Sequence, residues 1–141
     1  MTAVSQSVGY SGKSLSQKLG LKPGFRIFVA GAPVPYEKIV GTLPAGASVV
    51  ARATSDLDLV HIFASERKAL ADRLAPCRDA IKADGMIWIS WPKKASGLLT
   101  DLTDNVVREV ALPLGLVDVK VCAVDATWSG LKFVIRRELR G

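Results

Sequence analysis

Short apolar runs alternate with polar and amphipathic stretches along this chain, and the pattern predicts strands that alternate with helices. Runs of four to seven mostly apolar, β-forming residues are typical of strands that are buried in a sheet. Four such runs are predicted strands: 25–30, 48–51, 57–63 and 86–91. Two short helices are expected before the second strand. Ser14 would cap the first of them, Gly20 would end it, and the second would cover residues 36–40.

A longer helical stretch is predicted between the third and fourth strands. Leu70, Leu74, Cys77 and Ile81 recur at the spacing of one helix face, and Gly85 is expected to end the stretch. Pro76 lies inside this pattern. Because proline lacks a backbone N–H group, we expect a kink or two short helices there.

The next helix is expected to begin at Thr100, after the loop PKKASGLL, and to end at Pro113 and Gly115. Asp101 and Asp104 would lie in its first turn, where the helix dipole favours negative charge. Three apolar residues at helical spacing would form its inner stripe: Leu102, Val106 and Val110.

The last two predicted strands, 117–124 and 130–137, are joined by a short link and should form an antiparallel hairpin. The whole order predicts a single three-layer, Rossmann-like α/β domain. Its mainly parallel sheet would have about six strands in the order 2-1-3-4-6-5 and would end in that hairpin. The link between the second and third strands is short for a parallel crossover, so a hairpin is the alternative there.

Composition fits one domain, which we place at residues 13–141 after a flexible tail of residues 1–12. The chain has 141 residues, of which 49% are hydrophobic and 23% charged, and its formal net charge is +6. No apolar run approaches the roughly 18 residues that span a bilayer, and the first residues do not resemble a secretion signal, so a cytoplasmic protein is expected. Cys77 and Cys122 match no metal or redox spacing and are expected to be buried free thiols, so no metal site is predicted.

Several segments resemble known families. LKPGFRIFVAGAP, DLDLVHIF and LAPCRDAIKADGMIWISW resemble the first strand, fourth strand and fifth-strand passage of class I methyltransferases, a resemblance that concerns the fold. The segments YSGKSLSQKLGLKPG, WPKKASG, TDLTDNVVRE and DVKVCAVDATWSGLKFV are similar to a bacterial family of unknown function, number 3052. That likeness covers about residues 9–137 and implies no mechanism, because the family has no settled activity.

Three departures argue against a bound S-adenosylmethionine, and no cofactor is predicted. The methyltransferase pattern has several glycines after the first strand, whereas here Gly31 is followed by Ala32 and Pro33. The acidic residue expected after the second strand is missing, and Arg52 occupies that region. One strand–helix unit is also missing. A methyltransferase-like enzyme with a degenerate cofactor loop is the alternative.

A ligand is expected in the crevice at the carboxyl ends of the first and third strands, where the strand order reverses. Three segments should converge there: 31–36, 64–67 and 91–97. Lysines and free amide groups before a helix can hold a phosphate or carboxylate, although a solvated lysine pair on a loop is the simpler alternative. The candidate ligand-binding residues are Gly31, Ala32, Lys93, Lys94, Ser96 and Gly97.

Other candidates are single residues. Trp128, in the link between the last two strands, could anchor a partner surface or fold back onto the edge of the core. His61, the only histidine, lies within an apolar strand and is expected to be a core residue. No GxSxG motif or phosphate-binding loop is present, so no catalytic residue is predicted.

The sequence therefore predicts a non-catalytic domain that binds a small anionic ligand or a protein partner. Methyltransferase-like catalysis is one alternative. Weak nucleic-acid binding is another, because basic residues gather near both ends of the chain, but no recognition element accompanies them and nucleic acid is not the favoured partner.

Overall fold

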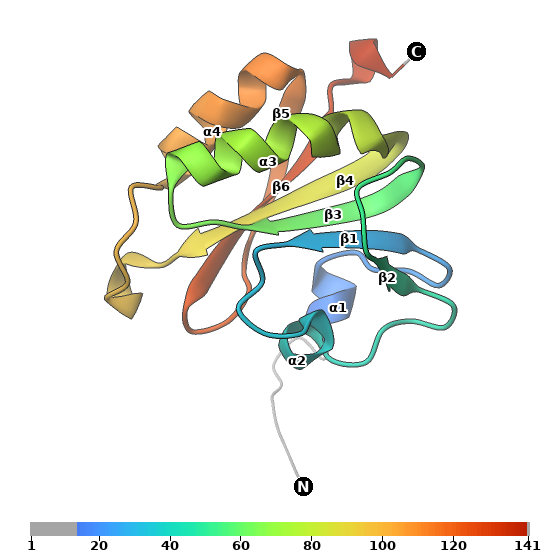
Figure 1. Cartoon of the computed structure of the whole chain (residues 1–141), viewed down its shortest axis with the longest axis horizontal. Helices are drawn as coiled ribbons and strands as arrows, with labels where there is room; N and C mark the ends of the chain where they lie inside the picture. Colours follow the sequence, from blue (N-terminus) through green and yellow to red (C-terminus); the bar gives the residue numbers. More distant parts are fainter. Residues whose placement is uncertain (1–13, 141) are drawn as a thin grey trace, which may run out of the picture.

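A six-stranded sheet in the order β2-β1-β3-β4-β6-β5 forms the centre of the molecule, as predicted (Figure 1). The computed structural model describes residues 14–140, so the predicted tail at residues 1–12 lies outside it. The strands are β1 (Arg26–Ala30), β2 (Ser48–Val50), β3 (Leu57–Phe63), β4 (Ile81–Pro92), β5 (Leu116–Ala123) and β6 (Trp128–Ile135). The first four are parallel, and β6 runs antiparallel to both β4 and β5.

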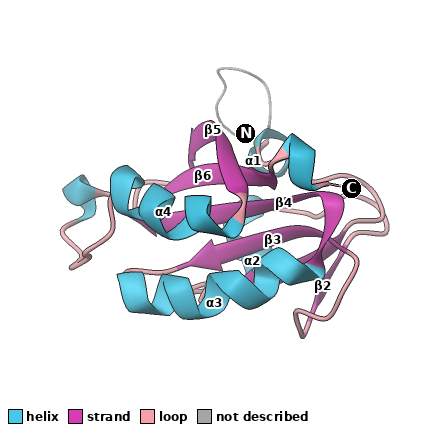
Figure 2. Ribbon diagram, turned by 90° about the horizontal axis from the view of Figure 1, so that it is seen from above, coloured by secondary structure: helices cyan, strands magenta, loops and turns pink. Residues whose placement is uncertain are grey.

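Helices cover both faces of this sheet and make the three predicted layers (Figure 2). The α-helices are α1 (Leu15–Lys18), α2 (Tyr36–Val40), α3 (Arg67–Ala80) and α4 (Asp104–Ala111). Within residues 14–140, short 3₁₀ helices follow β4, α4 and β6: η2 (Lys94–Ser96), η3 (Leu112–Leu114) and η4 (Arg137–Leu139). The first helix is capped as expected, because the Ser14 side chain accepts from the Gln17 amide while the Gln17 side chain accepts from the Ser14 amide.

The link between β2 and β3 carries the chain past β1, which lies between them and pairs parallel to both. The alternative of a β2–β3 hairpin is therefore wrong. Residues 51–56 make this connection without a helix or a further strand. So short a link suffices because β2 is only three residues long, which leaves little distance to return along the sheet.

Two apolar clusters pack on opposite faces of the sheet, and β3 contributes side chains to both. Val60 and Ile62 belong to the cluster beneath α3 and α4, whereas Leu59 and Phe63 belong to the cluster that packs with α1 and α2. A parallel strand buried on both faces has no polar side, which explains the nearly continuous apolar run in its sequence.

The predicted break in the third helix is wrong. α3 is continuous from Arg67 to Ala80 with Pro76 inside it. Leu70, Leu74 and Cys77 lie on its buried face, whereas Pro76 is exposed. Burying each leucine contributes roughly 2 kcal/mol, which offsets the roughly 3 kcal/mol that an internal proline costs.

The end of this helix also differs from the prediction. It stops at Ala80 rather than Gly85, and β4 begins at once. The pairing of β4 with β3 shifts between the Leu57–Ile81 and Leu59–Met86 pairs, so residues 82–85 form a bulge. Glycine is favoured at position 85, because a Cβ atom would lie only 3.0 Å from the Leu57 carbonyl oxygen.

The fourth helix begins later than predicted, at Asp104, and Thr103 is its N-cap. Asp101 instead accepts a hydrogen bond from the Arg67 amide at 2.7 Å, at the start of α3. Leu102 is buried but precedes the helix, so the predicted inner stripe is shifted by one residue. Val107 and Ala111 are the buried helical residues.

His61 is fully buried in β3, as expected, and links three elements through hydrogen bonds. Its Nδ1 atom lies 2.8 Å from the Tyr36 hydroxyl of α2, and its Nε2 atom lies 2.7 Å from the Ser90 hydroxyl of β4. The ring stacks on Phe63 at a centroid distance of 4.3 Å. Burial lowers the pKa of His61 to about 3, so the imidazole is neutral and one nitrogen donates while the other accepts.

Among the described residues, no helix combines the length and the apolar character that crossing a bilayer requires.

Replacing Tyr36 with phenylalanine should reduce the free energy of unfolding by about 1–3 kcal/mol, because a buried imidazole nitrogen would lose its only partner. Urea unfolding measures this change. A Tyr36→Phe protein as stable as the original would show that the hydrogen bond contributes nothing.

The protein should become less stable as the pH is lowered, to an extent that depends on His61. The unfolded chain, with a histidine pKa of about 6.5, binds this proton more tightly than the folded protein does. The free energy of unfolding should therefore decrease as the pH falls from about 6.5 toward 3, by up to about 1.4 kcal/mol per pH unit. Unfolding between pH 5 and 7 should show this slope, and His61→Gln should remove it.

Candidate functional site

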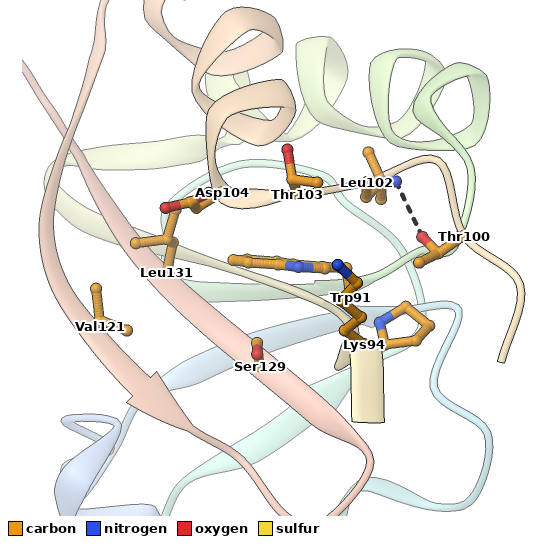
Figure 3. A pocket seen from close by; sticks show the side chains of 10 residues that line it. Trp91, Lys94, Thr100, Leu102, Thr103, Asp104, Val121, Ser129 and Leu131 are labelled. Atoms are coloured by element: carbon orange, nitrogen blue, oxygen red, sulfur yellow. Dashed lines mark hydrogen bonds between the residues drawn. The ribbon is translucent and has the colours of Figure 1, made fainter. Parts of the chain in front are cut away.

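A cavity of about 480 Å³ opens at the carboxyl end of β4, between the start of α4 and the β5–β6 hairpin (Figure 3). Residues of β4, β5, β6 and the 94–104 segment line it. They are Trp91, Pro92, Lys94, Thr100, Leu102, Thr103, Asp104, Val121, Ser129 and Leu131. The position follows from the fold, because the antiparallel β6 brings its first residues beside the last residues of β4. Trp128 is thus paired with Pro92.

The apolar part of the cavity is built around Trp91. Its indole lies edge-on at the centre of Figure 3, with Leu131 on one side and Lys94 in front. Leu102 and Leu131 belong to the same buried cluster as Trp91. The cavity thus combines a flat aromatic surface with aliphatic walls, which suits the apolar body of a small molecule.

The polar groups of the cavity come mainly from the start of α4. The Thr103 hydroxyl accepts from the Val106 amide at 3.2 Å, which leaves its own proton available to a ligand. The Thr100 hydroxyl is committed, because it donates to the Ser65 carbonyl at 2.6 Å and accepts from the Leu102 amide. Ser129 adds a further hydroxyl on the β6 side.

Among the residues that the structure describes, the charges around the cavity leave one cation without a partner. Asp104 is 3.3 Å from the Arg108 guanidinium, which offsets its charge. Asp101 is directed to the start of α3. Lys94 takes part in none of the ion pairs formed within residues 14–140. The rim of the cavity therefore favours a negative group.

The four candidate residues of the predicted lysine loop have different roles at this site. Only Lys94 of its four candidates lines the cavity. The Lys93 amide donates to the Thr127 carbonyl at 2.7 Å, which ties the loop to the hairpin. Ser96 donates to the Lys93 carbonyl and accepts from the Leu98 amide, and Gly97 has a φ of 77°. Ser96 and Gly97 thus shape the turn.

Gly31 and Ala32, the other candidates, lie at the end of β1 and do not line this cavity. Gly31 has a φ of 74°, and Arg73 of α3 reaches over it to donate to the Phe63 carbonyl at 2.8 Å. A Cβ atom on Gly31 would lie 2.5 Å from the Arg73 Nη1 atom and would also overlap the Phe63 carbonyl oxygen. The Arg73 side chain therefore occupies the crevice between β1 and β3, where a ligand was expected.

Trp128 folds back onto the core. It is half-buried and packs edge-on against Phe63 at a centroid distance of 5.3 Å. Asp125 fixes the preceding turn by accepting from the Thr127 and Trp128 amides. The indole therefore covers the edge of the cluster near α2 instead of standing free on the surface.

No histidine or cysteine is among the described residues that line the cavity. His61 is buried elsewhere and bonded at both nitrogens. Both cysteines are free. Cys77 is buried, and its thiol pKa is raised to about 11 by burial, whereas Cys122 is half-buried. In the part of the chain that the structure describes, no three His, Cys, Asp or Glu side chains gather as a metal site would require.

The sequence pattern offered a partial signal for this site. In MIWISW, Trp88 and Trp91 are three residues apart, which puts them on opposite faces of a strand. Trp91 thus faces α4. What the sequence did not reveal is that the β5–β6 hairpin forms the second wall, because that depends on how β6 pairs with β4.

Comparison with known proteins supports the fold. No family model matches the chain, and no curated protein matches its sequence. Solved structures do match. A methyltransferase dependent on S-adenosylmethionine (SAM) from Aquifex aeolicus has a TM-score of 0.61 and 12% identity, over 84% of this chain and 87% of that one. The fibrillarin pre-rRNA processing protein of Methanococcus jannaschii has a TM-score of 0.59 and 11% identity, over 82% and 68%.

A third match is magnesium protoporphyrin IX methyltransferase from Synechocystis with bound SAM. Its TM-score is 0.56 and its identity 12%, over 86% of this chain and 74% of that one. The chain therefore has the Rossmann-like fold of SAM-dependent methyltransferases. At sequence identities this low, the similarity supports an inference about the fold alone.

Gly31→Ala should destabilise the protein by at least about 2 kcal/mol more than Gly24→Ala, since steric overlap adds to backbone strain. The two glycines have similar φ angles, 74° and 78°, but a Cβ atom on Gly24 meets nothing within 4 Å. Urea unfolding of both variants measures the difference. Equal losses would mean that the Arg73 contact over Gly31 does not persist in solution.

Proposed function

We propose that this domain binds a small anionic ligand with a flat apolar body in the cavity beside Trp91, and that it does so without catalysing methyl transfer. The observation that carries the proposal is the pairing of the Trp91 surface with Lys94, a cation that no described carboxylate neutralises. The aromatic surface would take the body of the ligand, and Lys94 with the Thr103 hydroxyl would take its anionic group.

Non-catalytic binding is supported by the chemistry that the cavity offers. Its titratable side chains are Lys94 and Asp104, and Asp104 is paired with Arg108. Neither has a histidine or cysteine beside it that could act as a base or a nucleophile. Such a set can orient and hold an anion but has little with which to transfer a proton or a group.

The β1 turn supports the same proposal. Pro33 and Pro35 remove two amide donors from the segment where methyltransferases of this fold hold their cofactor. Arg73 occupies the space above Gly31. Arg52, exposed after β2, stands where a carboxylate would hold the ribose hydroxyl groups. We therefore infer that this fold serves here as a binding scaffold.

The alternative is a SAM-dependent methyltransferase with a degenerate loop. Two structural neighbours favour it, because one is a SAM-dependent methyltransferase and the other is a methyltransferase with bound SAM. Thermal unfolding with millimolar SAM and S-adenosylhomocysteine separates the two proposals. We expect a shift in Tm below about 1 °C, since a ligand far below its Kd adds little stability. A saturable shift of several degrees would support the methyltransferase alternative.

Anilinonaphthalene sulfonate, a flat aromatic anion, is a suitable probe of the cavity itself. Lys94→Gln should weaken its binding about fivefold, because an exposed charge pair contributes up to about 1 kcal/mol. Ser129→Phe should abolish binding by filling the cavity. Probe fluorescence measures both effects, and Lys38→Gln, on α2 across the sheet, is the matched control for loss of one charge.

Two results would overturn this proposal. One is equal binding of the probe to the original protein, Lys94→Gln and Ser129→Phe. The other is an equal loss in Lys94→Gln and Lys38→Gln, which would show general attraction to a basic protein. Far-UV circular dichroism should be unchanged in all three variants, so that the probe reports on a folded protein.

A further inference from the structure

Lys120 of β5 and Lys132 of β6 lie directly opposite one another in the antiparallel ladder. Side chains of such a pair have Cβ atoms about 5 Å apart, and like charges in these positions are destabilising. Both lysines face the α1 side of the sheet. The Lys120 Nζ atom donates to the Lys18 carbonyl at the end of α1, and Lys132 is opposite Trp88, whose indole donates to the Leu19 carbonyl.

A third lysine joins them from the segment after α1. The pKa of Lys132 is lowered, first by burial and then by the charges of Lys120 and Lys22. The three ammonium groups thus come from the segment after α1 and from the two strands of the β5–β6 hairpin, and their like charges repel one another.

No carboxylate of the described residues forms an ion pair with this group. None of the ion pairs within residues 14–140 includes Lys22, Lys120 or Lys132. The acid nearest in sequence, Asp118, is directed to the opposite face of the sheet, where it meets Arg108 at 3.1 Å. A register shift between Asp118 and Lys120 separates their directions. The Lys18 carbonyl holds the Lys120 ammonium in place but carries no net charge to offset it.

We propose that Lys22, Lys120 and Lys132 form a site for phosphate groups, separate from the Trp91 cavity and on the other face of the sheet. A compact set of lysines suits phosphate, because each ammonium acts as a point charge with three donors. Several like charges held together without a counter-charge need an anion of more than one charge to relieve their repulsion. Such a ligand is an oligophosphate or the backbone of a nucleic-acid strand.

Titration with inorganic tripolyphosphate and with a single-stranded oligonucleotide, each at low and high salt, tests the proposal. Lys120→Gln and Lys132→Gln should each weaken tripolyphosphate binding at least tenfold at low salt. Lys68→Gln, on α3 across the sheet, is the matched control and should change it less than twofold. The affinity should fall steeply as salt is added.

The oligonucleotide distinguishes the two sources of phosphate. If it competes with tripolyphosphate and binds more tightly, the ligand is a nucleic-acid strand. If only tripolyphosphate binds, the ligand is a small oligophosphate. Absence of binding by both, or equal weakening in Lys68→Gln and Lys132→Gln, would overturn the proposal.

Thermal unfolding gives an independent readout. Lys132→Gln should raise Tm at low salt and without ligand, because it removes the repulsion, while it weakens phosphate binding. Opposite effects on stability and binding are typical of a binding residue and are not expected of a structural one. A Lys132→Gln protein that loses both stability and binding would overturn the assignment. The Trp91 cavity should bind its probe normally in this variant. A failure of the phosphate-site proposal can therefore be told apart from a failure of the proposed function.

Discussion

Burial of β3 and β4 on both faces is the constraint on which the rest of this structure depends. Two central parallel strands can be covered on both sides only if helices pack above and below them, which gives the three layers. The same burial forces the polar groups inside to find partners. His61 is held between Tyr36 and Ser90 and so ties α2 to both strands.

That arrangement also determines where a ligand can bind. At the carboxyl edge between β1 and β3, α3 brings Arg73 over Gly31 and the Phe63 carbonyl. At the end of β4, by contrast, α4 starts several residues after the strand ends, and the β5–β6 hairpin stands on the other side. A cavity remains between them. The cavity therefore lies one to two strands away from the β1–β3 edge, where the strand order reverses.

The two faces of the β5–β6 hairpin then have different characters. On the α4 side, Ser129 and Leu131 help to enclose the aromatic cavity. On the α1 side, Lys120 and Lys132 lie opposite one another, and neither forms an ion pair with a described carboxylate. The alternation of side chains along a strand allows one hairpin to serve both surfaces, and a shift of register by one residue would exchange them.

The sequence by itself determined the element order, the sheet order and the buried position of His61, because apolar periodicity and turn residues act locally. It misplaced the boundaries near Pro76, Gly85 and Thr100, where packing outweighs local preference: the buried leucines keep α3 intact, and Thr103 rather than Thr100 caps α4. Among the candidate site residues, Lys94 could be named from its loop, whereas Ser129 and Leu131 could not. Only the tertiary structure decided which segments face one another across the cavity, and which lysines stand opposite each other, because both depend on the pairing of β6 with strands distant in sequence.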